Sequence, residues 1–198
     1  MNDLERQARR ARRRKYRRIA IIGFVVLIFG MAWFFESQAT TTIIVTRHAD
    51  ETLLGGSNPG LMPAGSLRAE ELARVLADVD VVGGVDAIFI QPTRSSQDTI
   101  LPLSMNVDAP VHLIKYPEDA EGAVSRMLRK YKGEIILVVM EAEYIQPLIR
   151  EMQGSKKLPE LGPQEFDNLY IVTIPWFGKV KTLRLRYGAP YVPSEPAG

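Results

Sequence analysis

The sequence predicts an α/β fold: a three-layer α/β/α sandwich with a mostly parallel sheet, preceded by one N-terminal transmembrane helix. Two observations lead to this prediction. Residues 19–35 form an apolar stretch without a single charge, which is about the length that a bilayer core requires. Beyond residue 40, apolar β-branched runs alternate with helical patterns, as is typical of a parallel sheet covered by helices on both faces.

The N-terminal segment is strongly basic before it becomes apolar. Residues 1–18 contain nine Lys and Arg against two acidic residues. As a helix, residues 19–35 would span about 25 Å, enough for a slightly thinned bilayer core. The positive-inside rule then predicts a basic cytoplasmic tail over 1–18 and a domain outside the cytoplasm. We therefore expect a single-pass protein of the inner or plasma membrane, with a periplasmic or extracytoplasmic domain.

Two other interpretations of this segment are weaker. A cleaved signal peptide is one, because Ser37-Gln38-Ala39 has small residues at suitable spacing. The apolar stretch is longer than usual for a signal peptide, however, and ends in Trp33-Phe34-Phe35, which suit the aromatic belt of a membrane interface. Nucleic-acid binding by the basic run is the other. The apolar span directly behind it favours membrane lipid as the partner instead, and no nucleic-acid partner is expected.

Composition limits the chemistry of the remaining chain. Cysteine is absent, which excludes disulfides and thiolate nucleophiles. The only histidines are His48 and His112, too few for a multi-histidine metal site. No metal and no cofactor is therefore expected. His112 falls inside an expected strand, and we interpret it as structural.

The expected elements follow a polar spacer at residues 36–40. The domain is expected over residues 41–188, with a flexible tail at 189–198. Strands are predicted from apolar β-branched runs: Thr41–Thr46, Ala87–Gln91, Val111–Ile114 and Ile135–Val139. Helices are predicted from helical spacing of apolar residues: Ala64–Asp78, Thr93–Leu103, Ala120–Tyr131 and Tyr144–Met152. Two alternating segments, Leu169–Pro175 and Lys179–Tyr187, predict a closing hairpin around Trp176-Phe177-Gly178.

Polar side chains follow three of the predicted strands. Arg47 and His48 follow the first, Arg94 the second and Glu141 the fourth. The loops after the carboxyl ends of parallel strands line the ligand crevice of such a sheet. Arginine offers a planar donor fork to phosphate oxygens, and a nearby histidine can act as nucleophile or acid/base. The pattern therefore indicates an anion site.

Several of these segments together resemble the histidine phosphatase (phosphoglycerate-mutase-like) superfamily, in particular its small bacterial members. The strand ending in Arg47-His48-Ala49 resembles the opening strand and Arg-His-(Gly/Ala) motif. The other matching segments are Leu61, Gly65, Arg68-Ala69 and Leu72, then Val85–Phe89, Arg94–Thr99 and Leu169–Tyr187. The resemblance covers residues 40–188. It implies that His48 takes a phosphoryl group that water then removes, with Arg47 and Arg94 holding the phosphoryl oxygens.

The sequence departs from this family after the fourth strand. A Gly-His turn is expected there, and Met140-Glu141 stands in its place. Met140 is expected to put a side chain where the backbone should approach the ligand. A carboxylate ~4 Å from a phosphate charge is repelled by roughly 4 kcal/mol per unit charge at an effective dielectric of about 20. Glu141 escapes this only if burial protonates it or if it acts as the general acid; Asp50 and Glu51 are other acid candidates.

The sequence leaves open whether the domain is an enzyme. The favoured hypothesis is a membrane-anchored histidine-phosphatase-fold domain with a degenerate site. Such a pseudoenzyme would be a weak or inactive phosphatase that binds a phosphorylated or anionic ligand, or a protein partner, outside the cytoplasm. The alternative is an active phosphomonoesterase, a histidine-type acid phosphatase that works through a phosphohistidine at His48 with Glu141 as acid/base. A bilayer-anchored structural module is a third hypothesis.

Overall fold

A computed structural model describes residues 3–36, 40–52, 56–77, 84–115 and 117–189. The chain divides into two compact units, residues 1–38 and 39–198. Parts of several predictions lie outside the described residues: the start of the basic tail at 1–2, the spacer and the candidate cleavage site at 37–39, the helix end at Asp78 and the tail at 190–198.

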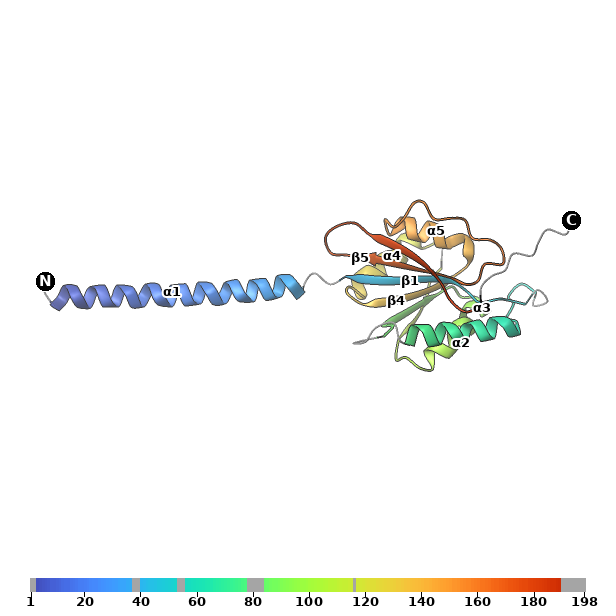
Figure 1. The fold of residues 1–198 in the computed structure, drawn as a ribbon, viewed down its shortest axis with the longest axis horizontal. Coiled ribbons are helices and arrows are strands. Elements are labelled where there is room, and N and C mark those ends of the chain that lie inside the picture. Colours follow the sequence, from blue (N-terminus) through green and yellow to red (C-terminus); the bar gives the residue numbers. More distant parts are fainter. Residues whose placement is uncertain (1–2, 37–39, 53–55, 78–83, 116, 190–198) are drawn as a thin grey trace. The chain divides into compact units, whose positions relative to one another are not determined.

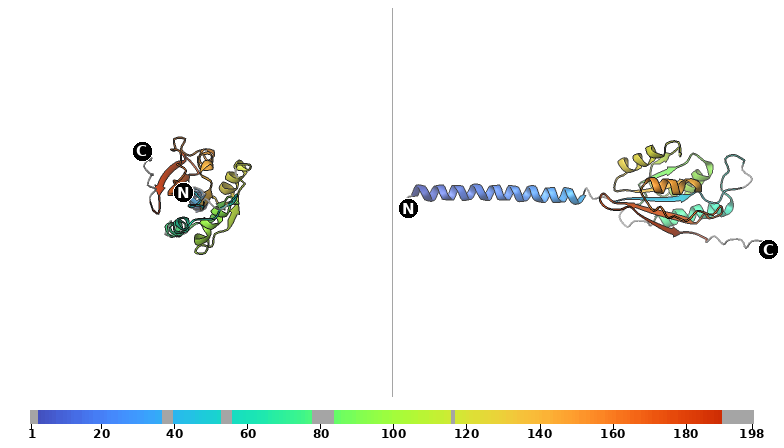
Figure 2. Two further views of the ribbon diagram at one scale, coloured as in Figure 1. Left: turned by 90° about the vertical axis from the view of Figure 1, so that its right-hand side faces the viewer. Right: turned by 90° about the horizontal axis from the view of Figure 1, so that it is seen from above.

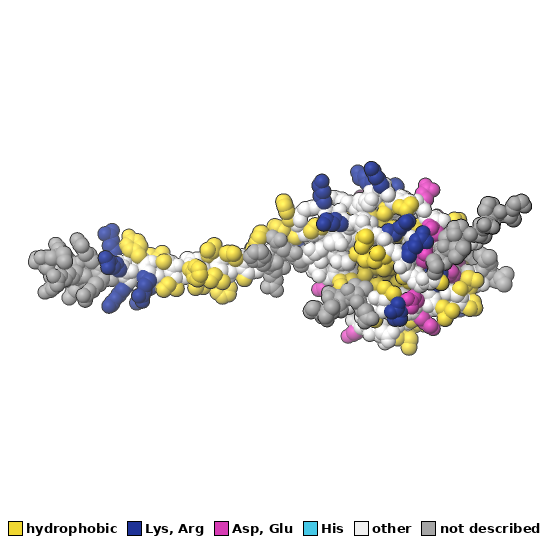
Figure 3. Space-filling model, in the orientation of Figure 1, with side chains coloured by type: hydrophobic (Ala, Val, Ile, Leu, Met, Phe, Trp, Pro, Cys, Tyr) yellow, Lys and Arg dark blue, Asp and Glu magenta, His cyan; other side chains and the backbone are white. Residues whose placement is uncertain are grey.

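The first unit is a single helix, α1 (Asp3–Glu36). Its segment Arg12–Phe34 is long and apolar enough to cross a membrane, and none of it is buried by protein. Figure 3 shows its described Lys and Arg side chains at one end, followed by hydrophobic side chains. An apolar helix that no protein covers is compatible with a membrane anchor or with a signal sequence. The predicted N-terminal helix is therefore confirmed.

The second unit is built on one six-stranded sheet. Its strands are β1 (Thr41–Arg47), β2 (Ala87–Ile90), β3 (Val111–Leu113), β4 (Ile135–Met140), β5 (Asn168–Ile174) and β6 (Lys181–Arg186). The order across the sheet is β3-β2-β4-β1-β5-β6. Only β5 runs against the others, because it pairs antiparallel with both β1 and β6. The mostly parallel sheet and its closing hairpin are therefore as predicted.

Helices cover both faces of this sheet. They are α2 (Pro63–Ala77), α3 (Arg94–Ser104), α4 (Ala120–Lys130) and α5 (Ala142–Glu151). Figure 1 shows α2 and α3 on one side and α4 and α5 on the other. The alternation of side chains along β1 explains the two cores: Ile44 packs against α2 and α3, whereas Ile43 and Val45 pack against α4 and α5. The predicted three-layer sandwich is confirmed.

A glycine fixes how closely α2 approaches the loop after β1. A Cβ atom on Gly65 would lie 2.1 Å from the backbone oxygen of Asp50, well inside any real contact distance. Only glycine allows this approach. The helix begins with Pro63, whose fixed φ suits a first helical position. The loop that carries His48 is therefore packed against a helix rather than free in solvent.

Candidate functional site

The register of the sheet brings two predicted site residues together. Arg47 at the end of β1 is aligned with Met140 at the end of β4. The next residues in each chain segment, His48 and Glu141, therefore leave the sheet side by side. The His48 backbone N–H donates to the Met140 carbonyl oxygen at 3.3 Å. The side chains meet as well, with His48 Nε2 3.1 Å from Glu141 Oε2.

Both ring nitrogens of His48 are engaged. The side chain is fully buried, and its Nδ1 lies 2.8 Å from the Ala49 carbonyl oxygen. Because a carbonyl oxygen only accepts, Nδ1 carries a hydrogen. Nε2 faces a carboxylate oxygen, so one proton lies between Nε2 and Glu141 Oε2. Both ring nitrogens therefore have a partner, and the partner of Nε2 is Glu141.

Glu141 is held in place by its own backbone. It precedes α5 directly, and its backbone N–H donates to Gln91 Oε1 at 2.6 Å. The hydrogen bond from His48 lowers the pKa of Glu141, and the positive charges of His48 and Arg47 add to this, against the raising effect of burial. Burial therefore does not protonate Glu141, contrary to one outcome that the sequence left open, and it is ionised at neutral pH.

A second carboxylate faces the same nitrogen. Glu51 Oε2 lies 3.9 Å from His48 Nε2, so one of the two additional acid candidates does reach the site. The other candidate, Asp50, has a different partner. Asp50 Oδ2 accepts from Arg68 Nε at 2.6 Å, and Arg68 also donates to the Ala189 carbonyl oxygen at 3.2 Å. We interpret Asp50 as a group that fastens α2 and the segment after β6 to the loop after β1.

Arg47 is buried beside this histidine. Its Nη1 donates to the Pro163 carbonyl oxygen at 2.8 Å, and its Cζ lies 3.7 Å from the centre of the Phe166 ring, a cation–π contact. Desolvation lowers the pKa of Arg47, and the carboxylates of Glu141 and Glu51 oppose that shift. The Nε–H is buried and has no partner among the described residues. One donor of the guanidinium is therefore buried without an acceptor among the described residues.

Arg94 lies outside this cluster. It is the first residue of α3, and its side chain is 66% exposed. Its Nε pairs with Asp98 Oδ2 at 3.6 Å, and its backbone N–H donates to Asn58 Oδ1 at 2.8 Å. Among the described residues it is not one of the groups that contact His48. The phosphate-binding role of Arg94 stays a prediction.

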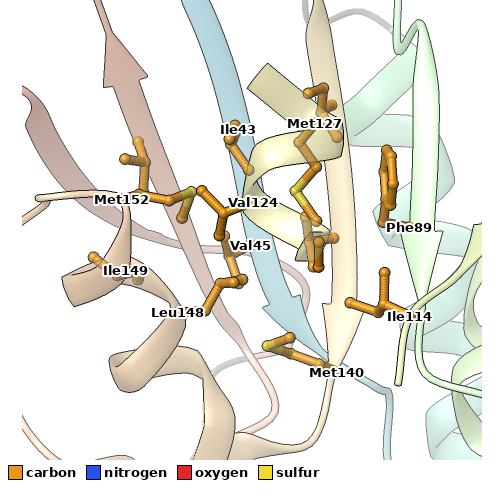
Figure 4. Packing of buried hydrophobic residues seen from close by; sticks show 14 of the residues in the cluster. Ile43, Val45, Phe89, Ile114, Val124, Met127, Met140, Leu148, Ile149 and Met152 are labelled. Atoms are coloured by element: carbon orange, nitrogen blue, oxygen red, sulfur yellow. The ribbon is translucent and has the colours of Figure 1, made fainter. Parts of the chain in front are cut away.

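Met140 does not point at the site. Its side chain is 0% exposed and belongs to the core between the sheet, α4 and α5, as Figure 4 shows. The sequence-based expectation that this side chain would crowd the ligand is therefore wrong. Because side chains alternate along a strand, Met140 shares the core face with Val138.

His112 has the structural environment that the sequence predicts. Its Nε2 lies 2.5 Å from the Tyr131 hydroxyl, and its ring packs on Phe89 with centroids 4.9 Å apart. Desolvation and the charges of Lys130 and Arg126 lower its pKa. Within the described ranges, no group of three or more Asp, Glu or His side chains is arranged to hold a metal ion.

Two residues of the site were missed at the sequence level. Gln91 follows β2 directly, so the rule that selected Arg47 and Glu141 would also have found it. Phe166 lies in the irregular segment before β5. No periodicity or motif in that segment signals that its ring lies under a guanidinium.

Comparison with known proteins supports the fold and goes no further. No protein-family model matches the sequence, and no curated protein matches it in sequence. Among solved structures, the protein histidine phosphatase SixA complexed with tungstate has a TM-score of 0.60 at 16% identity, covering 73% of this chain and 96% of that one. SixA from Agrobacterium tumefaciens gives 0.57 at 18% identity, covering 76% and 99%. Phosphoglycerate mutase from Plasmodium falciparum gives 0.54 at 17% identity, covering 81% and 98%. The second unit therefore has the histidine phosphatase fold.

Proposed function

We propose that this protein is a membrane-anchored histidine-phosphatase-fold domain with a degenerate active site. It is a weak or inactive phosphatase that binds a phosphorylated or otherwise anionic ligand, free or carried by a protein partner, outside the cytoplasm. The observation that carries the proposal is the 3.1 Å contact between His48 Nε2 and Glu141 Oε2. It places a carboxylate against the one histidine nitrogen that could act as nucleophile.

The charge at this position opposes phosphoryl transfer. A dianionic phosphoryl group would have to approach Nε2 past Glu141 and Glu51, both within 4.0 Å of that nitrogen. Each unit of like charge at ~4 Å costs roughly 4 kcal/mol at an effective dielectric of about 20. Glu141 also takes the place of a donor, and losing one such donor costs about 2.7–4 kcal/mol in the transition state. Together these effects lower the rate at least a thousandfold, at about 1.36 kcal/mol per factor of ten.

Binding is less impaired than turnover. The Arg47 Nε–H is a buried donor without an acceptor among the described residues, and leaving such a group unsatisfied costs about 1–3 kcal/mol. An anion oxygen at this position would satisfy it. Glu141 is 35% exposed, so its side chain has room to swing out when an anion enters.

The proposal also states how α1 holds the domain at the membrane. The basic residues at one end of α1 contact lipid head groups on the cytoplasmic side, and the apolar segment crosses the inner or plasma membrane. The domain then lies in the periplasmic or extracytoplasmic space. No nucleic-acid partner is part of the proposal. The uncovered apolar surface of Arg12–Phe34 supports it.

A phosphatase assay tests the catalytic part. The full chain, reconstituted in lipid nanodiscs, is assayed with a generic phosphomonoester at neutral pH beside His48→Ala and Glu141→Gln. We expect wild type to show no hydrolysis above the His48→Ala background. Strong wild-type activity that both substitutions abolish would reverse the proposal.

The same contact supports a second candidate, an active phosphomonoesterase with Glu141 as acid/base. Glu141 would take the proton from Nε2, which frees the lone pair to attack phosphorus while the ester P–O bond breaks. The protonated Glu141 would then give its proton to the departing oxygen, and water would hydrolyse the phosphohistidine. Glu141→Gln separates the two candidates. It abolishes turnover in this mechanism, whereas in the binding proposal it only removes a repelling charge.

A further inference from the structure

The turn between β5 and β6 lies at the end of the sheet where the chain enters the domain. Thr41, the first residue of β1, is aligned with Ile174, the last residue of β5. The turn that follows Ile174 is therefore beside the start of β1, as the right-hand view in Figure 2 shows. The candidate site is at the opposite end, because Arg47 ends β1.

This turn exposes two large aromatic side chains. Trp176 is 53% and Phe177 85% exposed to solvent. Gly178 has a φ of +117°, a conformation that side-chain-bearing residues rarely adopt, and it lets the chain reverse directly behind them. Two adjacent aromatic side chains at the tip of a hairpin are an unusual surface for a protein in water, and such features mark interaction sites.

Exposed lysines occur in the same part of the domain. Lys179 and Lys181 follow on the same hairpin and are exposed. A second exposed pair, Lys156-Lys157, follows Ser155, whose backbone N–H donates to Thr182 Oγ1 at 2.9 Å. We call Trp176, Phe177, Lys179 and Lys181 the hairpin tip.

Two acidic side chains at this end of the sheet lie on the other side of β1. Asp86 and Glu134 precede β2 and β4, which are on the side of β1 away from β5. On the side of the sheet that carries the hairpin tip, Glu151 at the end of α5 is outnumbered by exposed lysines, namely Lys156, Lys157, Lys179 and Lys181. This side is therefore positive. Aromatic side chains flanked by lysines are the composition that membrane–water interfaces favour, particularly where the lipids are anionic.

The chain enters the domain at the same end of the sheet as this tip, because β1 begins at Thr41. From Glu36, the last residue of α1, to Thr41 there are five Cα–Cα steps, which span at most about 18 Å. We infer that the hairpin tip docks on the membrane that α1 crosses, with Trp176 and Phe177 at the level of the head groups and the lysines against anionic lipid phosphates. This inference rests on the proposed anchor.

Docking would direct the candidate site away from the lipid. Arg47 lies six residues beyond Thr41 along β1, which corresponds to about 20 Å at roughly 3.3 Å per residue. The end of the sheet with His48 and Glu141 would then face the aqueous phase. A soluble ligand or the phosphorylated segment of another protein could reach it there.

Tryptophan fluorescence tests the docking directly, because the sequence contains only Trp33 and Trp176. Trp33→Phe leaves Trp176 as the sole reporter, and Trp176→Phe leaves Trp33. Each full-length variant is reconstituted in vesicles of phosphatidylcholine and phosphatidylglycerol, with or without bromine atoms on the acyl chains close to the head groups. We expect bromine to quench the emission of both tryptophans strongly.

Two further variants complete the experiment. Leu67→Trp, in a chain lacking both natural tryptophans, reports from a 67% exposed position in the first turns of α2, at the end of the sheet with the candidate site; we expect no quenching there. Lys179→Glu/Lys181→Glu in the Trp33→Phe chain should lose most of the quenching of Trp176.

The outcomes are distinguishable. If bromine quenches Trp33 but leaves Trp176 as unquenched as the Leu67→Trp reporter, the docking is overturned and the anchor stays intact. Absence of quenching at both natural tryptophans would overturn the anchor and the docking with it. Shielding of Trp176 from aqueous acrylamide without quenching by bromine would indicate a protein partner at the tip and would also overturn the docking.

Discussion

The loop after β1 and the loop after β4 form two halves of one site, and they differ in what they offer a phosphate. The first supplies Arg47 and a buried His48 in the order expected of the histidine phosphatase superfamily. The second supplies Glu141, which binds the histidine that the first half presents. The difference shows that a histidine can keep its place in the sequence while another side chain engages its ring nitrogen. One carboxylate at the end of β4 is enough to engage Nε2 of His48.

The first prediction separates the two residues of the altered turn. Met140→Ala should lower the free energy of unfolding by about 2–5 kcal/mol, because it removes a fully buried side chain from the core. Denaturant unfolding of the full chain in detergent micelles measures this effect. Glu141→Gln is the matched control and should change stability by less than about 1 kcal/mol. Similar losses in the two variants would contradict the core position of Met140.

The second prediction restores the missing donor. Glu141→His should raise His48-dependent phosphatase activity by about 10²–10³-fold over wild type, which is the usual worth of one transition-state donor. Met140 is kept, since its removal would damage the core without opening the site. The control is Glu141→His/His48→Ala, which should fall back to background. If Glu141→His is no more active than wild type, parts of the site other than the loop after β4 also prevent turnover.

Much of the fold follows from local sequence signals. Each predicted strand and helix agrees with the structure to within about two residues, because β-branched runs and helical spacing are strong signals in a sheet buried on both faces. The pairing of His48 with Glu141 does not follow so directly. The sequence places both at strand ends, but their contact depends on the register of β1 and β4, which no single segment encodes.

The side-chain positions of Arg94, Met140 and Phe166 differ in how well the local sequence predicts them. The outward direction of Arg94 has a local cause, since Asp98 lies one helical turn further along α3 and pairs with it. Alternation along β4 would also have placed Met140 in the core. The position of Phe166 under Arg47 has no comparable signal, because the segment before β5 is irregular and its path is set by tertiary packing.

The third prediction compares the arginines of the site as anion ligands. Sulfate or phosphate that binds only the native state should raise the melting temperature by mass action. Glu141→Gln should bind at least about tenfold more tightly than wild type. The full repulsion of one charge is roughly 4 kcal/mol, but Glu141 is 35% exposed, so that solvent screening reduces it. Arg47→Lys should abolish most of the shift, because lysine lacks the donor fork.

Arg94→Ala is the control for the third prediction. Arg94 is mostly exposed and paired with Asp98, so its loss should reduce the ligand-induced shift only slightly. Each shift is measured against the same variant without ligand, which removes differences in intrinsic stability. An Arg94→Ala effect as large as that of Arg47→Lys would show that the two arginines hold the anion together.

The fourth and smallest effect concerns pH. The hydrogen bond from His48 lowers the pKa of Glu141 in the folded protein. A carboxyl group with a lowered folded pKa contributes stability that is present above its unfolded pKa and is lost as the pH falls through the folded value. The stability advantage of wild type over Glu141→Gln should therefore shrink as the pH falls below about 4.5. Because Glu141 is one-third exposed, the whole effect should stay below about 1 kcal/mol.

Unfolding of wild type and Glu141→Gln between roughly pH 3 and 6 measures this difference, since titrating groups common to both proteins cancel. Glu51→Gln is measured alongside as the control for loss of a neighbouring carboxylate, because Glu51 lies farther from His48 Nε2, at 3.9 Å. An advantage of wild type that grows as the pH falls would mean that the folded state favours the protonated carboxyl group. Glu141 would then be able to donate a proton near neutral pH, and the loop after β4 would supply a general acid rather than block the nucleophile.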